Sequence, residues 1–162
     1  MPLFLTNIDL LNASQKYNIP LNDVFSKDQI PTLRQGGYIV NLESSHDSYG
    51  RKLGGSHWVG FWIDDLRPSK CVFFDPFGTA PPLEIQELLD EFVPYNYSSV
   101  QIQSVASGIC GYYCLFFVFW MGKMKGKIPN INTRLEKFLK QFNLKNPSKN
   151  REILDKLLRK NF

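Results

Sequence analysis

Residues 110–121 read Cys-Gly-Tyr-Tyr-Cys-Leu-Phe-Phe-Val-Phe-Trp-Met, which is the longest apolar run in the chain. A helix that crosses a bilayer needs about 20 consecutive apolar residues, so this run is too short to do so. It therefore predicts a buried helix at the centre of the fold, and we expect the other segments to pack around it.

The segments around this helix indicate an α+β domain, in which a mixed or antiparallel sheet packs on the central helix. Strands are expected at residues 38–42, 57–63, 70–74 and 97–103. Helices are expected at residues 8–17 and 82–92, and two amphipathic helices near residues 132–142 and 148–160. The stretches around Pro20 and Pro31 and over residues 43–55 are predicted to be loops.

Length and composition favour one folded domain over residues 1–162. A chain of 162 residues has the usual size of a single domain. Hydrophobic residues make up 43% of the chain and charged residues 21%, which argues against intrinsic disorder. We expect the domain to be monomeric.

Positive charge is concentrated in the C-terminal helical part, residues 123–162. This part contains 12 Lys and Arg against 3 Asp and Glu, a net charge of +9, whereas residues 1–122 contain 7 against 12, a net charge of −5. A basic surface can bind polyanions such as DNA through phosphate contacts and counterion release. An ordinary solvated Lys-rich surface explains the same charges, and both interpretations stay open at this point.

The cysteine count and the first residues suggest a protein of the cell interior that is not secreted. Three cysteines are an odd number, unlike the paired framework of small secreted domains. Their spacing also lacks the paired ligands of a structural zinc site, so no metal is expected. The opening MPLFLTNIDLLN has neither a basic segment nor a small-residue cleavage site, so we predict no secretory signal and no membrane contact.

Cys110 stands where a loop turns into the central helix, after Ser107-Gly108-Ile109. The first N–H groups of a helix and its dipole stabilise negative charge there, which favours a reactive thiolate. Gly111 removes a side chain beside it, at a point where another group must approach closely. Free cysteines are also common core residues, and that role suits Cys114 and Cys71 better than Cys110.

A thiolate nucleophile needs a base, and the chain has two histidines, His46 and His57. His46 lies in a polar loop, whereas His57 opens a predicted strand. A symmetric hairpin around Leu66 would pair residue 63 with 69, 61 with 71, 59 with 73, and His57 with Asp75. This register places a carboxylate beside the imidazole, where it can orient the ring. A bulge in the connection would shift the pairing by one and separate the two groups.

An oxyanion donor completes the set that acyl transfer by a thiol requires. Gln103 ends the predicted strand 97–103, seven positions before Cys110, so its amide can reach the space beside the thiol together with the Cys110 N–H. Gln101 lies on the same face of that strand and is the competing donor.

These residues resemble the adenovirus-type cysteine proteases, adenain and its relatives, which are related to the proteases that process ubiquitin-like modifiers. The similar stretches follow in family order over about half the chain: residues 39–41 (Ile-Val-Asn), 54–58 (Gly-Gly-Ser-His-Trp), 71–78 (Cys-Val-Phe-Phe-Asp-Pro-Phe-Gly), Gln103, and 107–114 (Ser-Gly-Ile-Cys-Gly-Tyr-Tyr-Cys). The resemblance implies a circularly permuted papain-like architecture with the catalytic cysteine at the N-terminus of the central helix.

The resemblance also implies the roles: Cys110 is the nucleophile, His57 the base, Asp75 its orienting carboxylate and Gln103 an oxyanion donor. Six residues between Gln103 and Cys110 match the adenain spacing, whereas the modifier-processing relatives usually have five. Asp75 departs from adenain, which usually has Glu before its Pro-Phe-Gly. The region near Phe92 also lacks the cysteine through which adenain of human-type viruses bonds an activating viral peptide.

The resemblance therefore predicts a viral cysteine endopeptidase that cleaves capsid or core precursor proteins during virion maturation, within the virion and the host cell interior (nucleus or cytoplasmic virus factory). No cofactor is expected to be obligatory, and activation by DNA or by a viral peptide stays open. Two alternatives remain: a protease that removes ubiquitin-like modifiers, of deSUMOylase or deubiquitinase type, and a non-enzymatic DNA-binding virion protein on the same fold.

Overall fold

The computed structural model describes residues 5–29, 31–43, 49, 57–104 and 108–162. Its centre is a five-stranded mixed sheet whose strands lie in chain order, β1-β2-β3-β4-β5, as the sequence predicts for a sequential sheet. The strands are β1 (Leu21–Ser26), β2 (Gly36–Asn41), β3 (Trp58–Ile63), β4 (Cys71–Phe74) and β5 (Asn96–Tyr97). The two outer pairs, β1 with β2 and β4 with β5, are parallel, and the two inner pairs are antiparallel.

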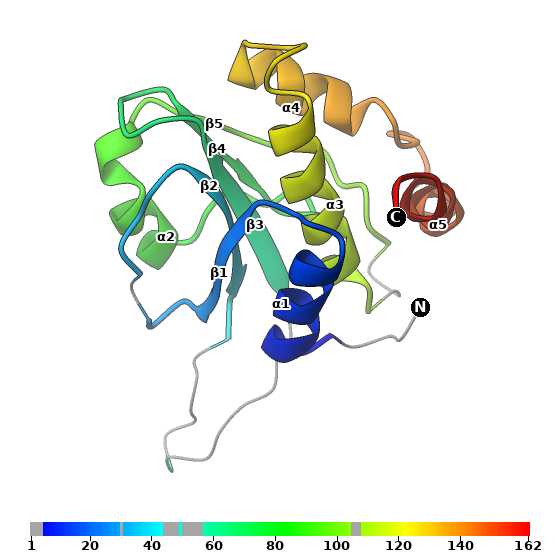
Figure 1. Ribbon diagram of the computed structural model, residues 1–162, viewed down its shortest axis with the longest axis horizontal. Helices are drawn as coiled ribbons and strands as arrows, with labels where there is room; N and C mark the ends of the chain where they lie inside the picture. Colours follow the sequence, from blue (N-terminus) through cyan, green and yellow to red (C-terminus); the bar gives the residue numbers. More distant parts are fainter. Residues whose placement is uncertain (1–4, 30, 44–48, 50–56, 105–107) are drawn as a thin grey trace.

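Helices cover both faces of this sheet (Figure 1). The central helix α3 (Cys110–Lys123) packs on one face, and α1 (Asn7–Lys16), α4 (Ile131–Leu139) and α5 (Asn150–Asn161) lie on the same side. The short helix α2 (Leu83–Leu88) and the 3₁₀ turn η1 (Asp90–Phe92) pack on the opposite face. A second 3₁₀ turn, η2 (Pro147–Lys149), precedes α5. The predicted α+β architecture with a central helix is confirmed.

The inner strands are buried on both faces, so their side chains divide by alternation between two apolar clusters. In β3, Trp58 and Trp62 face α3, whereas Val59 and Phe61 face α2 and η1. Gly37 in β2 allows close packing, because a Cβ atom at this position would collide with the side chain of Val118 in α3. The central helix is therefore held tightly against the strands that lead to the site.

Local signals explain the helix boundaries. Thr6 and Asp9 form a capping box at the start of α1, with the Thr6 N–H donating to the Asp9 carboxylate at 2.8 Å and the Asp9 N–H donating to the Thr6 hydroxyl at 3.1 Å.

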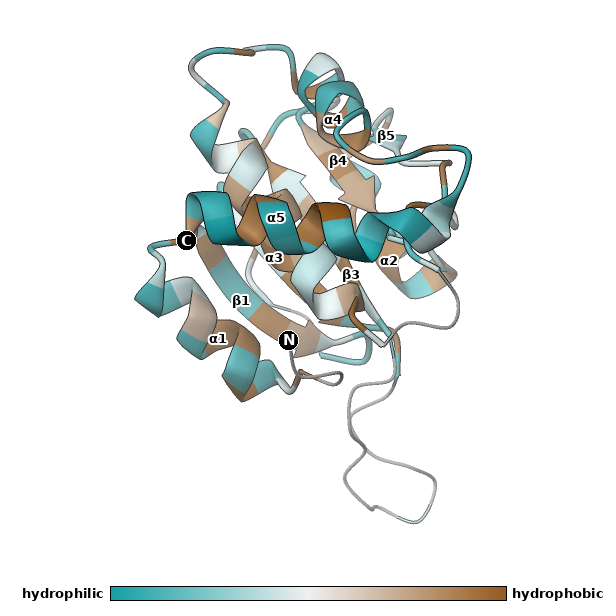
Figure 2. Cartoon of the chain, turned by 90° about the vertical axis from the view of Figure 1, so that its right-hand side faces the viewer, coloured by the Kyte–Doolittle hydropathy of each residue, from teal (hydrophilic) through white to brown (hydrophobic). Residues whose placement is uncertain are grey.

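Helix α5 alternates hydrophilic and hydrophobic residues along its length (Figure 2), and Leu154 on its apolar side is fully buried. None of the helices in the described part of the chain combines the length and apolarity that a membrane crossing requires.

Two elements differ from the sequence prediction. The stretch after Pro20, predicted to be a loop, contains the edge strand β1, which the polar pair Asn22 and Asp23 conceals in the sequence. The strand predicted over residues 97–103 is wrong, since β5 ends at Tyr97 and the following residues run as irregular backbone. Two backbone bonds fasten that segment, from the N–H groups of Ile102 and Gln103 to the carbonyl of Pro76, and they replace the expected strand pairing.

Candidate active site

Cys110 is the first residue of α3, at the loop-to-helix transition that the sequence predicts. Its N-cap, Ile109, makes no side-chain capping hydrogen bond, so Cys110 lies at the positive end of the α3 dipole without a capping side chain. The Cys110 sulfur accepts a hydrogen bond from the Trp58 N–H at 3.3 Å. Both features stabilise negative charge on this sulfur.

His57 and Asp75 contact each other at the open end of the β3–β4 hairpin, where β3 begins and β4 ends. The imidazole Nε2 lies 2.8 Å from Asp75 Oδ1, and the carboxylate is almost fully buried, with 4% of its side chain exposed. The His57 side chain is 18% exposed, and Cys110 lies close enough to the ring to help raise its pKa. Since Asp75 occupies Nε2, the nitrogen left for Cys110 is Nδ1.

The predicted hairpin register is wrong by two residues, although the His57–Asp75 contact exists. The structure pairs Phe61 with Phe73 and Ile63 with Cys71, so paired residue numbers add up to 134 instead of 132. A shift of two keeps every side chain on its predicted face, whereas a shift of one would reverse it. His57 therefore reaches Asp75 diagonally instead of from the directly opposite position.

The proton affinity of the His57 ring is governed by opposing effects. Burial lowers its pKa, but hydrogen bonds to Asp75 and Cys110, together with the negative charges of both groups, outweigh that effect and raise the pKa from 6.5 to about 9. The ring is consequently an imidazolium at neutral pH. A cation in this position is complementary to a thiolate on one side and to a carboxylate on the other.

The structure separates the two candidate oxyanion donors. Gln103 is 1% exposed and its backbone N–H bonds the Pro76 carbonyl at 3.0 Å, next to Asp75. Gln101 is exposed, and its side-chain amide donates to the Gln103 carbonyl at 2.9 Å. The two side chains thus lie in different surroundings, and the choice of Gln103 as the oxyanion donor stays a prediction.

The other two cysteines are core residues, as the sequence indicates. Cys71 lies in β4 and Cys114 in α3, one turn after Cys110, and all three cysteines are free thiols. Burial raises the pKa of the Cys71 and Cys114 thiols, which keeps them protonated. The Cys114 S–H donates to the Trp58 carbonyl at 3.4 Å, so the Trp58 backbone bonds both cysteines of α3.

Sequence reasoning assigned no role to Phe77, and its surroundings indicate one. Its ring stacks on the His57 ring, with centroids 4.6 Å apart and planes 21° from parallel. The available signal in the sequence was its position in the Asp75-Pro-Phe-Gly stretch, two residues after the predicted carboxylate. Of the other residues singled out above, His46, residues 54–56 and Ser107 lie outside the described part of the structure.

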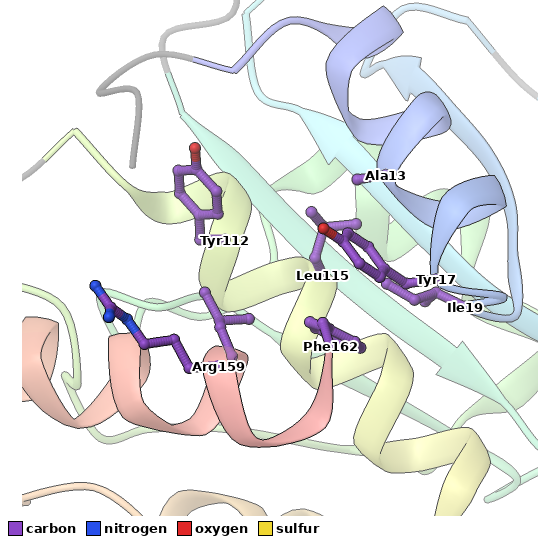
Figure 3. A pocket seen from close by; sticks show the side chains of 8 residues that line it. Ala13, Tyr17, Ile19, Tyr112, Leu115, Arg159 and Phe162 are labelled. Carbon is purple, nitrogen blue, oxygen red and sulfur yellow. The ribbon is translucent and has the colours of Figure 1, made fainter.

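A cavity of about 260 Å³ lies between α1, α3 and α5 (Figure 3). Its walls are mostly apolar and include Tyr17, Leu115 and Phe162, with Tyr112 and Arg159 at its edge. His57, Asp75 and Cys110 are not among its lining residues, so we do not regard it as the reactive centre.

The basic C-terminal part is only partly available to a polyanion. Arg134 is fully buried and ion-paired with Asp64 at 2.7 Å. Three further cations pair with carboxylates one helical turn away, namely Lys140 with Glu136, Lys156 with Glu152 and Arg159 with Asp155. Lys137 in α4, Lys145 in the connection, Lys149 in η2 and Arg151 in α5 are exposed and belong to the part of this charge that a polyanion can reach.

Comparison with known proteins agrees with the class of chemistry that this geometry allows. No family model matches the chain. It is similar to a protein named Protease from Bovine adenovirus 4, at 28% identity over 100 residues that cover 49% of this chain and 47% of that protein. The match thus spans about half the length of the relative. The similarity supports a viral protease, and among viral proteases one of the adenovirus type.

Proposed function

We propose that the chain is a cysteine endopeptidase of the adenovirus type, which cleaves capsid or core precursor proteins during virion maturation. The observation that carries the proposal is the convergence of three side chains from separate elements. His57 Nε2 is bonded to the buried Asp75 carboxylate, and the N–H of the next residue, Trp58, bonds the sulfur of Cys110 at the start of α3, which places that sulfur beside the ring.

The reaction follows from these positions. In the resting imidazolium–thiolate pair the Cys110 proton is already on His57 Nδ1, and the thiolate attacks the carbonyl carbon of the scissile peptide bond, forming a C–S bond. The Cys110 N–H and the Gln103 amide stabilise the negative oxygen of the tetrahedral intermediate. His57 then gives its proton to the leaving amine as the C–N bond breaks, and a water molecule deprotonated by His57 hydrolyses the thioester.

Asp75 keeps the imidazole in the orientation that this sequence of steps needs. Its carboxylate fixes Nε2 and stabilises the charged ring, which leaves Nδ1 directed to the sulfur. An Asp in place of the usual adenain Glu serves this role, because the Asp75 side chain reaches the ring at 2.8 Å.

The decisive experiment compares Cys110→Ala with Cys71→Ala on precursor polypeptides and peptide libraries. Cys110→Ala is expected to abolish cleavage while the unfolding curve stays close to that of the wild type. Cys71→Ala removes an equally buried thiol on the other face of the sheet and is expected to retain cleavage. Cleavage by Cys110→Ala would contradict the proposal.

Thiol labelling distinguishes an enzyme from a DNA-binding protein that has only the fold of a protease. At pH 6 iodoacetamide is expected to modify Cys110 much faster than Cys71 or Cys114, because only a thiolate reacts quickly and burial keeps the latter two protonated. Equal, slow labelling of the three would favour the non-enzymatic alternative. Probes that end in a ubiquitin-like modifier test the other alternative, and their cleavage without precursor cleavage would support it.

DNA is the polyanionic partner that we propose for the C-terminal helices. The exposed cations on this surface predict an affinity that falls steeply as salt rises. Charge reversal at Lys145 and Lys149, which are both exposed, is expected to weaken binding, whereas Lys140→Glu should have a smaller effect because Lys140 is already paired with Glu136. Affinity that does not depend on salt would remove DNA from the proposal.

Activation by a viral peptide is tested in the cleavage assays, where it would appear as cleavage that occurs only when virion extract is added.

A further inference from the structure

Phe77 contacts both members of the His57–Asp75 pair. Its ring lies parallel to the imidazole, with centroids 4.6 Å apart, and its backbone N–H donates to Asp75 Oδ1 at 2.8 Å. That oxygen is also the one that lies 2.8 Å from His57 Nε2. One residue therefore holds the carboxylate through its backbone and the imidazole through its side chain.

The stacked ring favours the charged, correctly oriented form of the imidazole. An aromatic face attracts a cation that lies over it, and a flat ring stacked on the imidazole opposes rotation out of the plane of the Nε2 hydrogen bond. Phe77 is itself half-buried, and the His57 side chain on which its ring stacks is 18% exposed.

The backbone around Phe77 is fixed by contacts on both sides. The Gly78 N–H closes the turn onto the Asp75 carbonyl at 2.8 Å, and Gly78 has a left-handed φ of 73°. A Cβ atom on Gly78 would lie 2.6 Å from the carbonyl carbon of Val100, so the turn packs in direct contact with the backbone of the segment that leads to Gln103. The Phe77 ring is thereby held over His57 by a turn that has little freedom to move.

We propose that Phe77 is a positioning residue, whose ring fixes the His57 imidazole against Asp75 and excludes water from their hydrogen bond. The inference rests on the proposed function, because it assigns Phe77 a part in preparing His57 for proton transfer with Cys110. It goes beyond that function by giving the Phe77 side chain a role that the nucleophile, base and carboxylate do not require.

The test compares Phe77→Leu, which keeps apolar volume but loses the flat ring, with Phe77→Tyr, which keeps the ring. Phe119→Leu is the matched control, because Phe119 is also a half-buried aromatic but packs against Phe162 at the other end of α3. In peptide cleavage, Phe77→Leu is expected to lower kcat about tenfold, which corresponds to about 1.4 kcal/mol of barrier, and to leave KM within about twofold. Phe77→Tyr is expected to restore most of kcat, and Phe119→Leu to leave it unchanged.

A second readout needs no substrate. The rate of Cys110 alkylation against pH reports the imidazolium–thiolate pair, and Phe77→Leu is expected to slow labelling at pH 6 about threefold or more. Wild-type kcat and an unchanged labelling profile in Phe77→Leu would overturn the role, and so would a Phe77→Tyr variant as impaired as Phe77→Leu. Slow labelling of Cys110 in the wild type would instead count against the proposed function itself.

Discussion

The His57 ring provides the sharpest prediction, because its pKa changes between the unfolded and the folded chain. Folding raises this pKa from 6.5 to about 9, despite burial, through Asp75 and Cys110. A group whose pKa is raised on folding stabilises the native state fully below its unfolded pKa, and this stabilisation is lost as the pH rises through the folded pKa. The contribution of His57 is therefore complete below about pH 6.5 and absent above about pH 9.

The size of the effect follows from the pKa difference. Each pKa unit corresponds to 1.36 kcal/mol, so protonation of His57 contributes on the order of 3 kcal/mol to the free energy of unfolding. Its side chain is only 18% exposed, so solvent screens the interaction weakly. The variant His57→Gln lacks the titrating ring, and the difference in unfolding free energy between wild type and variant should narrow by about 3 kcal/mol between pH 6.5 and 9.5.

Urea denaturation at a series of pH values measures that difference, and NMR titration measures the ring directly. The chain has two histidines, so a His46→Gln sample assigns the His57 signals without ambiguity. Cys110→Ala and Asp75→Asn should each lower the midpoint of the His57 titration, because each removes a hydrogen bond and a negative charge. A wild-type midpoint at or below 6.5, or a stability difference that does not change with pH, would refute this account of the site.

Three further predictions concern stability and the oxyanion donor. Arg134→Met should lower the free energy of unfolding in urea by about 3 to 5 kcal/mol, since it leaves the Asp64 carboxylate buried without its ion pair. Adding Asp64→Leu to this variant should recover most of the lost stability. A double variant as unstable as Arg134→Met alone would contradict this explanation. Gly78→Ala should lower Tm by several degrees and reduce kcat, because its φ of 73° and the Val100 backbone leave no room for a Cβ atom; unchanged values would count against the turn as a support. Gln103→Ala should lower kcat about 10²- to 10³-fold, whereas Gln101→Ala should lower it less than about threefold; the reverse order would move the donor role to Gln101.

The expected stability loss for Arg134→Met is large because every guanidinium donor is used. Two of its N–H groups bind Asp64 at 2.9 and 2.7 Å, and the other three reach the carbonyl oxygens of Met121, Ile128 and Pro129. Arg134 thus joins the end of α3, the start of α4 and the β3–β4 turn. In the sequence Arg134 is one of the cations of the basic C-terminal part, since a charge pattern does not reveal which cation is buried.

Alternation and helix signals were sufficient to predict the faces of the site, but not the register of the hairpin. The central helix and the two inner strands follow from apolar runs and period-two patterns, and these place His57 and Asp75 on the same face. The register depends on the turn, where the Asp64 N–H bonds the Lys70 carbonyl at 2.8 Å and Ser69 takes a positive φ of 67°. Residue types in the turn do not determine this conformation, so a symmetric connection was a reasonable but wrong assumption.

The segment before Cys110 shows a second limit of sequence patterns. The polar and apolar residues at 99–103 alternate like a strand, yet Gln101 is exposed and Gln103 is buried. The cause is tertiary, because two consecutive N–H groups, those of Ile102 and Gln103, both bond the Pro76 carbonyl and turn the chain there. The spacing that the adenain resemblance implied favoured Gln103, and that donor role stays a prediction which the Gln103 and Gln101 variants test.

The candidate site consists of two parts, one carried by the sheet and its loops and the other by α3, and the backbone of Trp58 joins them. The turn after β4 carries Asp75 and is bonded to the segment that carries Gln103, whereas Cys110 belongs to α3. Trp58 links α3 to β3, since its N–H bonds the Cys110 sulfur and its carbonyl accepts from Cys114. His57 directly precedes Trp58, so the distance between imidazole and thiol depends on how α3 packs on the sheet. Looser packing at this contact should consequently reduce kcat before it unfolds the domain, because proton transfer tolerates a smaller displacement than an apolar contact does.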